Sequence, residues 1–188
     1  MIETQRLILR RWKESDLEPF AAINQDPLVM ATLGPLRTRE ETAQSIKRIE
    51  DHFVDYGYGL YAAELKEPRA LIGFIGCQHL SLDLPVRPTL EIGWRLGSQY
   101  WGRRLAPEGA RAVLNDMFSR PGIDEIVSIT AMVNIKSMSV MKRLGMHTDP
   151  AENFDHPKVP VDSPLRRHVL YRLKKHEFLL PLASQGHK

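Results

Sequence analysis

The spacing of apolar and polar positions changes twice within residues 90–118, and the rest of the chain is organised around this stretch. Residues 90–96 (LEIGWRL) combine apolar and β-favouring side chains and predict a strand of about seven residues. The next segment, 97–102, contains two glycines and has no apolar period. Helical spacing then begins, with small and apolar residues at Leu105, Gly109, Ala112, Val113 and Met117. The pattern predicts a strand, a turn and a helix in succession.

Capping signals predict two helices before this stretch. Ser15 and Thr38 each begin a capping box, with a glutamate three positions later, at 18 and 41. We expect Pro27 to follow the end of the first helix, and the second helix to run to about residue 56. Strands are predicted over 6–12, 60–65 and 70–78, the last two as an antiparallel hairpin.

The pattern after the central helix predicts a second strand followed by a helix. Residues 126–133 read as a buried strand, Asn134 as the cap of a helix over 135–144, and Gly145 as its end. Residues 149–165 hold four prolines and no period, so they predict a long loop before a closing strand over 167–173. The length of 188 residues fits a single domain, expected over 1–180, with a frayed tail over 181–188.

Composition argues against nucleic-acid and membrane partners. The net charge of +3, from 26 basic and 23 acidic residues, is too mild to indicate nucleic-acid binding. Cys77 is the only cysteine, which excludes an intramolecular disulfide and favours a reducing compartment. The start of the chain lacks a long apolar run, and no segment approaches the roughly 20 apolar residues of a membrane span. We therefore expect a cytoplasmic protein without nucleic-acid or membrane partners.

The start of the central helix is a candidate anion site. Proline lacks an N–H and is tolerated in the first helical turn, so Pro107 places the helix cap near Arg103 or Arg104. The first amides of a helix have no intrahelical partner, and the helix dipole adds partial positive charge there. A phosphate or pyrophosphate suits the amides of residues 102–106. Many strand–helix connections look similar, so an ordinary connection is the open alternative.

The turn resembles the acetyl-CoA-binding motif of the GNAT acetyltransferases, which reads Gln/Arg-x-x-Gly-x-Gly/Ala. Residues 99–104 here read QYWGRR, so Arg104 stands where the family usually has glycine or alanine. Other matching segments are the start over 3–10, the NIKS and LGM pieces at 134–137 and 144–146, and the ending over 168–173. The resemblance covers residues 3–174 and is nearest to the branch that includes the bacterial ribosomal-protein acetyltransferases.

The resemblance implies an α/β GNAT fold, with a mixed, mostly antiparallel sheet of six or seven strands, splayed central strands and helices on both faces. It implies acetyl-CoA as cofactor and no metal, with segments 28–36 and 153–166 beside the acceptor. The residues expected at the cofactor are Trp94, Arg95, Leu96, Gln99, Trp101, Gly102, Arg103, Arg104, Leu105, Ala106, Asn134 and Ser137.

The implied activity is direct transfer of acetyl from acetyl-CoA to a primary amine, on a protein N-terminus or a small molecule. A non-catalytic acyl-CoA-binding regulator with the same fold is the alternative. No residue pattern names the amine, and a homodimer is compatible with such a fold.

Glu91 is the first candidate for the general base, because burial in an apolar strand would raise its pKa. The alternative is a structural carboxylate paired with an arginine or with backbone amides. The tyrosine that protonates the thiolate in many GNAT members falls on Met141, so Ser137 is the nearest hydroxyl for proton donation or cofactor binding, with Ser139 a weaker candidate. More ordinary roles in packing and turns are favoured for His79, Asp155, His156 and Cys77.

Overall fold

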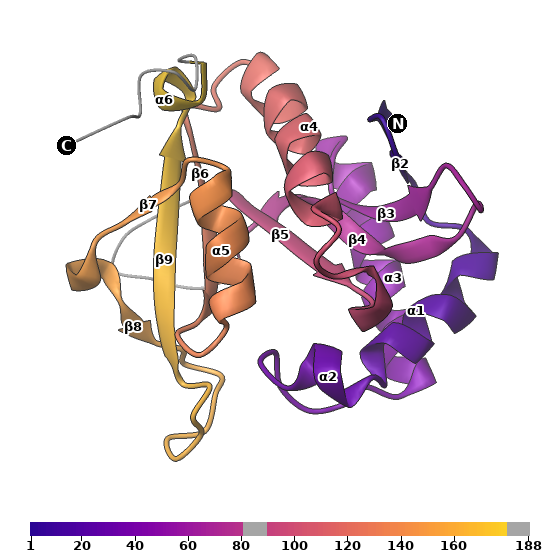
Figure 1. The fold of residues 1–188 in the computed structure, drawn as a ribbon, viewed down its shortest axis with the longest axis horizontal. Coiled ribbons are helices and arrows are strands. Elements are labelled where there is room, and N and C mark those ends of the chain that lie inside the picture. Colours follow the sequence, from indigo (N-terminus) through magenta and orange to yellow (C-terminus); the bar gives the residue numbers. More distant parts are fainter. Residues whose placement is uncertain (81–89, 180–188) are drawn as a thin grey trace.

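The computed structural model describes residues 1–80 and 90–179 and contains a nine-stranded sheet (Figure 1). The strand order is β1-β2-β3-β4-β5-β6-β9-β7, with β8 also paired to β9, and every pair is antiparallel except β5–β6. The long strands are β2 (Leu7–Arg10), β3 (Leu60–Leu65), β4 (Leu71–His79), β5 (Leu90–Leu96), β6 (Glu125–Ala131) and β9 (Arg167–Lys174). The two-residue strands are β1 (Ile2–Glu3), β7 (His147–Thr148) and β8 (Phe154–Asp155).

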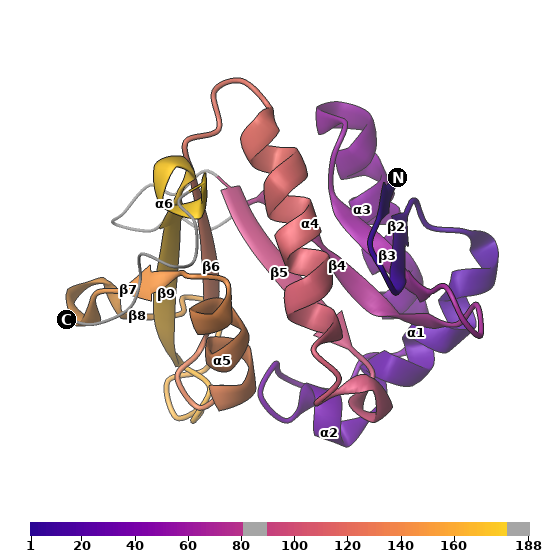
Figure 2. The same ribbon diagram turned by 45° about the horizontal axis from the view of Figure 1, so that its top comes forward.

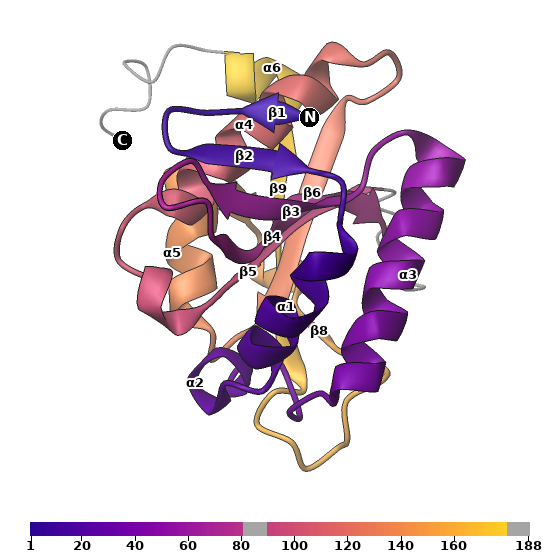
Figure 3. The ribbon, with the colours of Figure 1, turned by 90° about the vertical axis from the view of Figure 1, so that its right-hand side faces the viewer.

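Helices cover both faces of the sheet. α1 (Leu17–Asn24) and α3 (Arg39–Tyr56) lie on one face, in front of the sheet in Figure 3, and α4 (Leu105–Ser119) and α5 (Ile135–Arg143) lie on the other. Short helices follow α1 and β9, namely α2 (Pro27–Met30) and α6 (Lys175–Leu179). The 3-10 turns are η1 (Glu14–Asp16), η2 (Ser98–Tyr100) and η3 (Pro150–Glu152).

The two faces of β5 belong to different helix layers. β4 and β5 pair in unbroken register from Gly73↔Leu96 to His79↔Leu90, and side chains alternate between faces along each strand. Ile75 of β4 lies against α4, whereas Phe74 meets Phe20 of α1 with ring centroids 6.0 Å apart. The β5 side chains on the α4 face are Leu90, Ile92, Trp94 and Leu96, and those on the α1 face are Glu91, Gly93 and Arg95.

β5 and β6 part soon after they meet. They are parallel, and Glu91↔Val127 is their one paired position. Beyond it the strands diverge, and α4 and α5 begin near the diverging ends (Figure 2). The fold class predicted from the sequence is confirmed, including the splayed central strands.

Several local predictions need correction. Nine strands replace six or seven, because the two-residue strands form by long-range pairing and have no alternating pattern of their own. The Ser15 capping box is wrong: the Asp16 carboxylate accepts from the Lys13 amide at 2.8 Å, and α1 begins only at Leu17. Asp26 caps α2 by accepting from the Leu28 amide at 2.8 Å. The strands predicted over 6–12 and 126–133 are shorter, as β2 and β6.

Other predictions are confirmed. The Thr38 hydroxyl accepts from the Glu41 amide at 3.1 Å, and the Glu41 carboxylate accepts from the Thr38 amide at 2.7 Å. The frayed tail predicted over 181–188 lies outside the described residues. Within residues 1–80 and 90–179, no helix is long and apolar enough to cross a membrane.

Candidate active site

The start of α4 presents unpaired backbone amides. No turn or cap hydrogen bond among the described residues uses the amides of 102–104, and those of Leu105 and Ala106 begin the helix without an intrahelical acceptor. Arg104 is the N-cap and provides no side-chain hydrogen bond there. Its φ of 59° lies in the left-handed region, which favours glycine at this position and marks Arg104 as locally strained.

Gly102 leaves the space in front of these amides open. Its φ is +74°, and a Cβ added to it would meet no heavy atom within 4 Å. Arg103 and Arg104 are exposed beside it, whereas the Leu105 side chain is buried in the core, so residue 105 contributes only its amide. The acidic residue of the first turn, Glu108, is held away by Thr4 at 2.6 Å and by Arg6 at 2.7 Å. The start of α4 therefore suits an anion.

A cation–π contact joins this turn to the start of α5. The Lys136 ammonium lies 3.8 Å from the centre of the Trp101 ring, and the Trp101 indole donates to the Leu96 carbonyl at 2.9 Å. In α5, the Asn134 side chain accepts from the Ser137 amide at 3.1 Å, so this oxygen caps the helix. The Ser137 hydroxyl forms no hydrogen bond with another described residue. The two helix starts thus flank the gap between β5 and β6.

The strand β5 turns free backbone groups toward this gap. The Gly97 amide donates to the Ile72 carbonyl of β4 at 2.9 Å. Because N–H groups alternate in direction along a strand, those of Trp94 and Leu96 point away from β4, to the side that β6 has left. These amides are positioned to pair with an extended chain or to donate to a developing negative charge.

Glu91 lies where β5 leaves β6. Burial raises the pKa of its carboxyl to about 7, against lowering contributions from the Gln78 side chain and the Ile129 amide. The Gln78 amide donates to Glu91 at 3.5 Å. In the part of the chain that the structure describes, no lysine or arginine forms an ion pair with Glu91. The structural role considered for Glu91 was pairing with an arginine or with backbone amides. Pairing with a described arginine is not seen, and one backbone amide, that of Ile129, lowers the pKa of Glu91.

The structure separates Arg95 from the other cofactor candidates. Its side chain lies on the α1 face, where Nη1 donates to the Asn24 side chain at 2.6 Å. Burial, with a further contribution from Arg37, lowers the pKa of Arg95 to about 10. Asn24 carried no signal in the sequence, because its partner lies far along the chain. Gln99 is exposed in η2 and lines a different hollow, of about 750 Å³, beside α1 and β3.

The remaining candidates have ordinary partners. His79 Nε2 contacts the Tyr58 hydroxyl at 2.9 Å, Asp155 pairs with Arg166 and Arg167, and His156 accepts from the Lys158 amide at 3.2 Å. Burial raises the pKa of Cys77 and keeps its thiol protonated. The Ser139 hydroxyl donates to the Ile135 carbonyl of its own helix at 2.9 Å.

Met141 occupies the position of the missing tyrosine and is fully buried. We expect Met141→Ala to lower the free energy of unfolding by about 2–5 kcal/mol, because the removed side chain leaves a cavity. Urea denaturation measures this loss, with Met132→Ala at an exposed position as control. Near-equal losses in the two variants would contradict a packing role for Met141.

The acetyltransferase (GNAT) domain family matches residues 6–147 of this chain. The uncharacterized N-acetyltransferase YnaD of Bacillus subtilis is 28% identical over 152 residues, 79% of this chain and 83% of that protein. An acetyltransferase structure from Agrobacterium tumefaciens has a TM-score of 0.73 at 26% identity and covers 92% of both chains. RimL, a ribosomal-protein α-N-acetyltransferase in complex with coenzyme A, has a TM-score of 0.73 at 15% identity, covers 91% of this chain and 95% of that one, and shares the fold.

Proposed function

The chain belongs to the GNAT acetyltransferase family, and from this premise we propose that it transfers acetyl from acetyl-CoA directly to a primary amine. The amine belongs to a small molecule or to a protein N-terminus. The observation that carries the proposal is the position of Glu91, a carboxyl where β5 leaves β6 that forms no ion pair with any described lysine or arginine.

Acetyl-CoA is the acetyl donor, and it supplies the acetyl group as a thioester. The amides of 102–106 would hold its pyrophosphate, with Arg103 and Arg104 beside them and Gly102 leaving room for close approach. The β5 amides of Trp94 and Leu96 would bind the extended arm and the thioester carbonyl.

Glu91 acts as general base in this proposal. An ammonium ion has no lone pair, so the acceptor must lose a proton before it attacks. A carboxyl with a pKa of about 7 is ionised at neutral pH in a large fraction of molecules and is basic enough to accept that proton, directly or through water. Glu91 lies on the α1 face of β5, away from α4, so the amine approaches from the side opposite the proposed pyrophosphate site.

Ser137 contacts the cofactor in this proposal. We expect Ser137→Ala to raise the KM for acetyl-CoA by about 3- to 10-fold while kcat changes by less than about twofold, as for lost binding without lost chemistry. Ser139→Ala is the matched control, because that hydroxyl is already bonded within its own helix. A large fall in kcat at constant KM would instead assign Ser137 to proton donation.

Thiol release from acetyl-CoA over a panel of primary amines tests the activity. Steady release that depends on the amine supports an N-acetyltransferase. Tight acetyl-CoA binding with no release across peptides, polyamines and amino acids would favour the alternative of a non-catalytic acyl-CoA-binding regulator. The replacement of the family's tyrosine by Met141 is the feature that keeps this alternative open.

A further inference from the structure

Arg95 is a largely buried arginine that pairs with no carboxylate among the residues that the structure describes. Nη1 donates to the Asn24 side chain, the guanidinium lies 5.7 Å from the centre of the Phe74 ring, and Nε is buried with no hydrogen-bond partner. No ion pair involves Arg95 within the described residues. A buried cation with incomplete hydrogen bonding is costly to a fold. Arg95 is therefore poorly explained as a residue that stabilises the protein.

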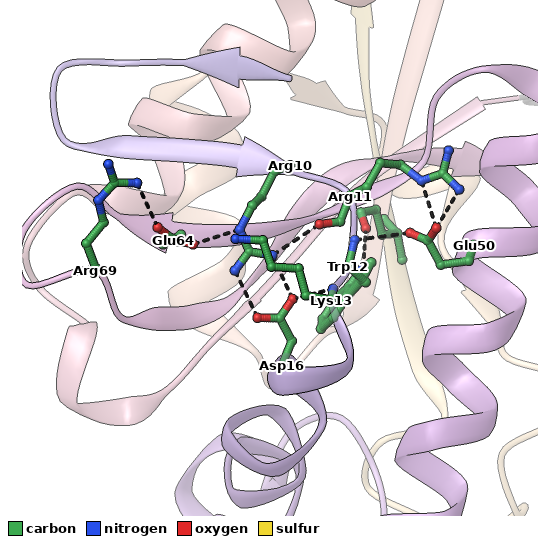
Figure 4. Close-up of polar contacts among 9 residues, drawn as sticks. Arg10, Arg11, Trp12, Lys13, Asp16, Glu50, Glu64 and Arg69 are labelled. Atoms are coloured by element: carbon green, nitrogen blue, oxygen red, sulfur yellow. Dashed lines mark hydrogen bonds and ion pairs between the residues drawn. The ribbon is translucent and has the colours of Figure 1, made fainter.

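Arg10 provides a contrast within the same chain. Its side chain is only 12% exposed, and it is fully compensated (Figure 4). Nη1 lies 2.6 Å from Asp16 and Nε lies 2.7 Å from Glu64. A structural arginine in this fold thus has two carboxylates, whereas Arg95 has a neutral amide and an aromatic ring.

A second unpaired arginine lies beside Arg95. The Arg37 amide donates to the Asn24 carbonyl at 3.1 Å, and its guanidinium donates to Ser45 at 3.1 Å. Arg37 has no ion pair with a described carboxylate. It lines a hollow of about 590 Å³ between the end of α1 and the start of α3. Asn24 thus contacts both arginines: its side chain accepts from Arg95, and its carbonyl accepts from the amide of Arg37, which borders the opening.

The strand surface between Glu91 and Arg95 is open. Both residues lie on the α1 face of β5, and the residue between them on that face is Gly93. A Cβ added to Gly93 would meet no heavy atom within 4 Å. The Cα atoms of residues 91 and 95 are about 13 Å apart at the usual rise of a strand. A small molecule can therefore contact the strand between the proposed base and the guanidinium.

We infer that the acceptor amine carries a carboxylate, which binds the Arg95 guanidinium while the amine lies toward Glu91. This inference rests on the proposed function. A guanidinium presents donors in a planar fork that matches a carboxylate, and the bond is strengthened where both groups are desolvated. Arg37 adds positive charge on the same side and favours an anionic acceptor.

Matched acceptors test the inference. The kcat/KM for thiol release is measured with ω-amino acids from glycine to 6-aminohexanoate, with their amides, and with short peptides that carry Asp or Asn at the second position. We expect the carboxylate member of the productive pairs to be favoured by about tenfold or more, the usual worth of a charge-assisted hydrogen bond. If the amino acids and their amides release thiol, the carboxylate belongs to a free amino acid. If the Asp and Asn peptides do so, the carboxylate belongs to a peptide side chain.

Variants assign the preference to Arg95. Arg95→Met should remove it while the KM for acetyl-CoA stays constant, and Arg95→Lys should retain part of it. The Tm separates function from structure, because Arg95→Met should leave Tm unchanged or higher once the unpaired charge is gone. Arg10→Met is the control and should lower Tm, since it leaves Asp16 without its ion-pair partner and Glu64 with Arg69 alone.

Binding of the N-acetylated products provides a readout without turnover. Calorimetry with each N-acetyl ω-amino acid and its amide should show carboxylate-dependent binding that Arg95→Met abolishes. If no amine releases thiol but this binding is seen, the acetyl-transfer proposal fails and the carboxylate site stands. Three results would overturn the inference. The first is thiol release at equal rates with carboxylate and amide acceptors, and the second is a carboxylate preference that survives in Arg95→Met. The third is binding of N-acetylated products that does not depend on their carboxylate.

Discussion

Glu91→Gln is expected to lower kcat/KM for acetyl transfer by about 100-fold or more, the usual worth of a general base. Glutamine keeps the size of the side chain and an oxygen for the Ile129 amide, but it cannot accept the proton of the amine. Acetyl-CoA affinity, measured by calorimetry, should stay within about twofold, because Glu91 lies on the face away from α4.

The pH profile gives an independent check on Glu91. Wild-type kcat/KM should rise with pH through about 7 as Glu91 ionises, and this rise should be absent in Glu91→Gln. Gln78→Met is the matched control on the neighbouring strand. The Gln78 hydrogen bond lowers the pKa of Glu91, so its loss should move the rise to higher pH with little loss of the maximal rate. An unchanged profile in Glu91→Gln would reject Glu91 as the base.

Stability should respond to the same ionisation with a defined sign. The folded state keeps the Glu91 proton up to about pH 7, whereas the ordinary value in an exposed chain is 4.5. The folded protein therefore binds more protons between these values, and its stability falls as pH rises through this window. Glu91→Gln should lack this fall and should be more stable than wild type by about 1–3 kcal/mol above pH 8.

Gly102→Val is expected to weaken acetyl-CoA binding by about tenfold or more, because the added side chain occupies the space in front of the α4 amides. A Cβ added at residue 102 meets no heavy atom within 4 Å in the free protein, so lost affinity reports on the ligand more than on a clash within the fold. The positive φ of residue 102 should cost about 1–2 kcal/mol of stability.

Gly122→Val is the matched control for Gly102→Val. Gly122 has a φ of +77°, and its added Cβ also meets no heavy atom within 4 Å. It lies in the turn between α4 and β6, at the other end of α4 from the proposed site. Both variants should lose similar stability, and only Gly102→Val should lose affinity. Equal affinity in the two would remove the start of α4 from the binding site.

The sequence predicted the β5–α4 unit well because its signals are local. Two glycines, Pro107 and a change of apolar period mark a turn and a helix start without help from distant residues. Ser15 misled because its capping pattern competes with Asp16, whose carboxylate is already engaged by Arg10 and the Lys13 amide. This competition between Ser15 and Asp16 depends on Arg10, which comes from β2, the strand that precedes the helix.

The site residues also divide into those with a local signal in the sequence and those that depend on contacts between distant segments. Glu91 was apparent as a charge in an apolar strand, whereas the lack of an ion pair at Arg95 within residues 1–80 and 90–179 depends on the tertiary arrangement of the fold. Its contact with Asn24 joins α1 to β5, and no spacing in the sequence encodes that approach. Arg104 replaces the glycine or alanine of the acetyl-CoA-binding motif, and its left-handed φ shows that this replacement strains the backbone. A comparison of motif sequences alone does not reveal that strain.

The divergence of β5 from β6 also bears on self-association. A long strand with unpaired amides at the rim of a sheet is a template onto which another chain can add and aggregate. Here the unpaired stretch at Trp94 and Leu96 lies inside the strand order, with strands of the same chain on both sides. The outer rims are β1 on one side and β7 and β8 on the other, each only two residues long. An unpaired edge inside the sheet is thus less accessible to a second protein chain than an edge at the outer rim.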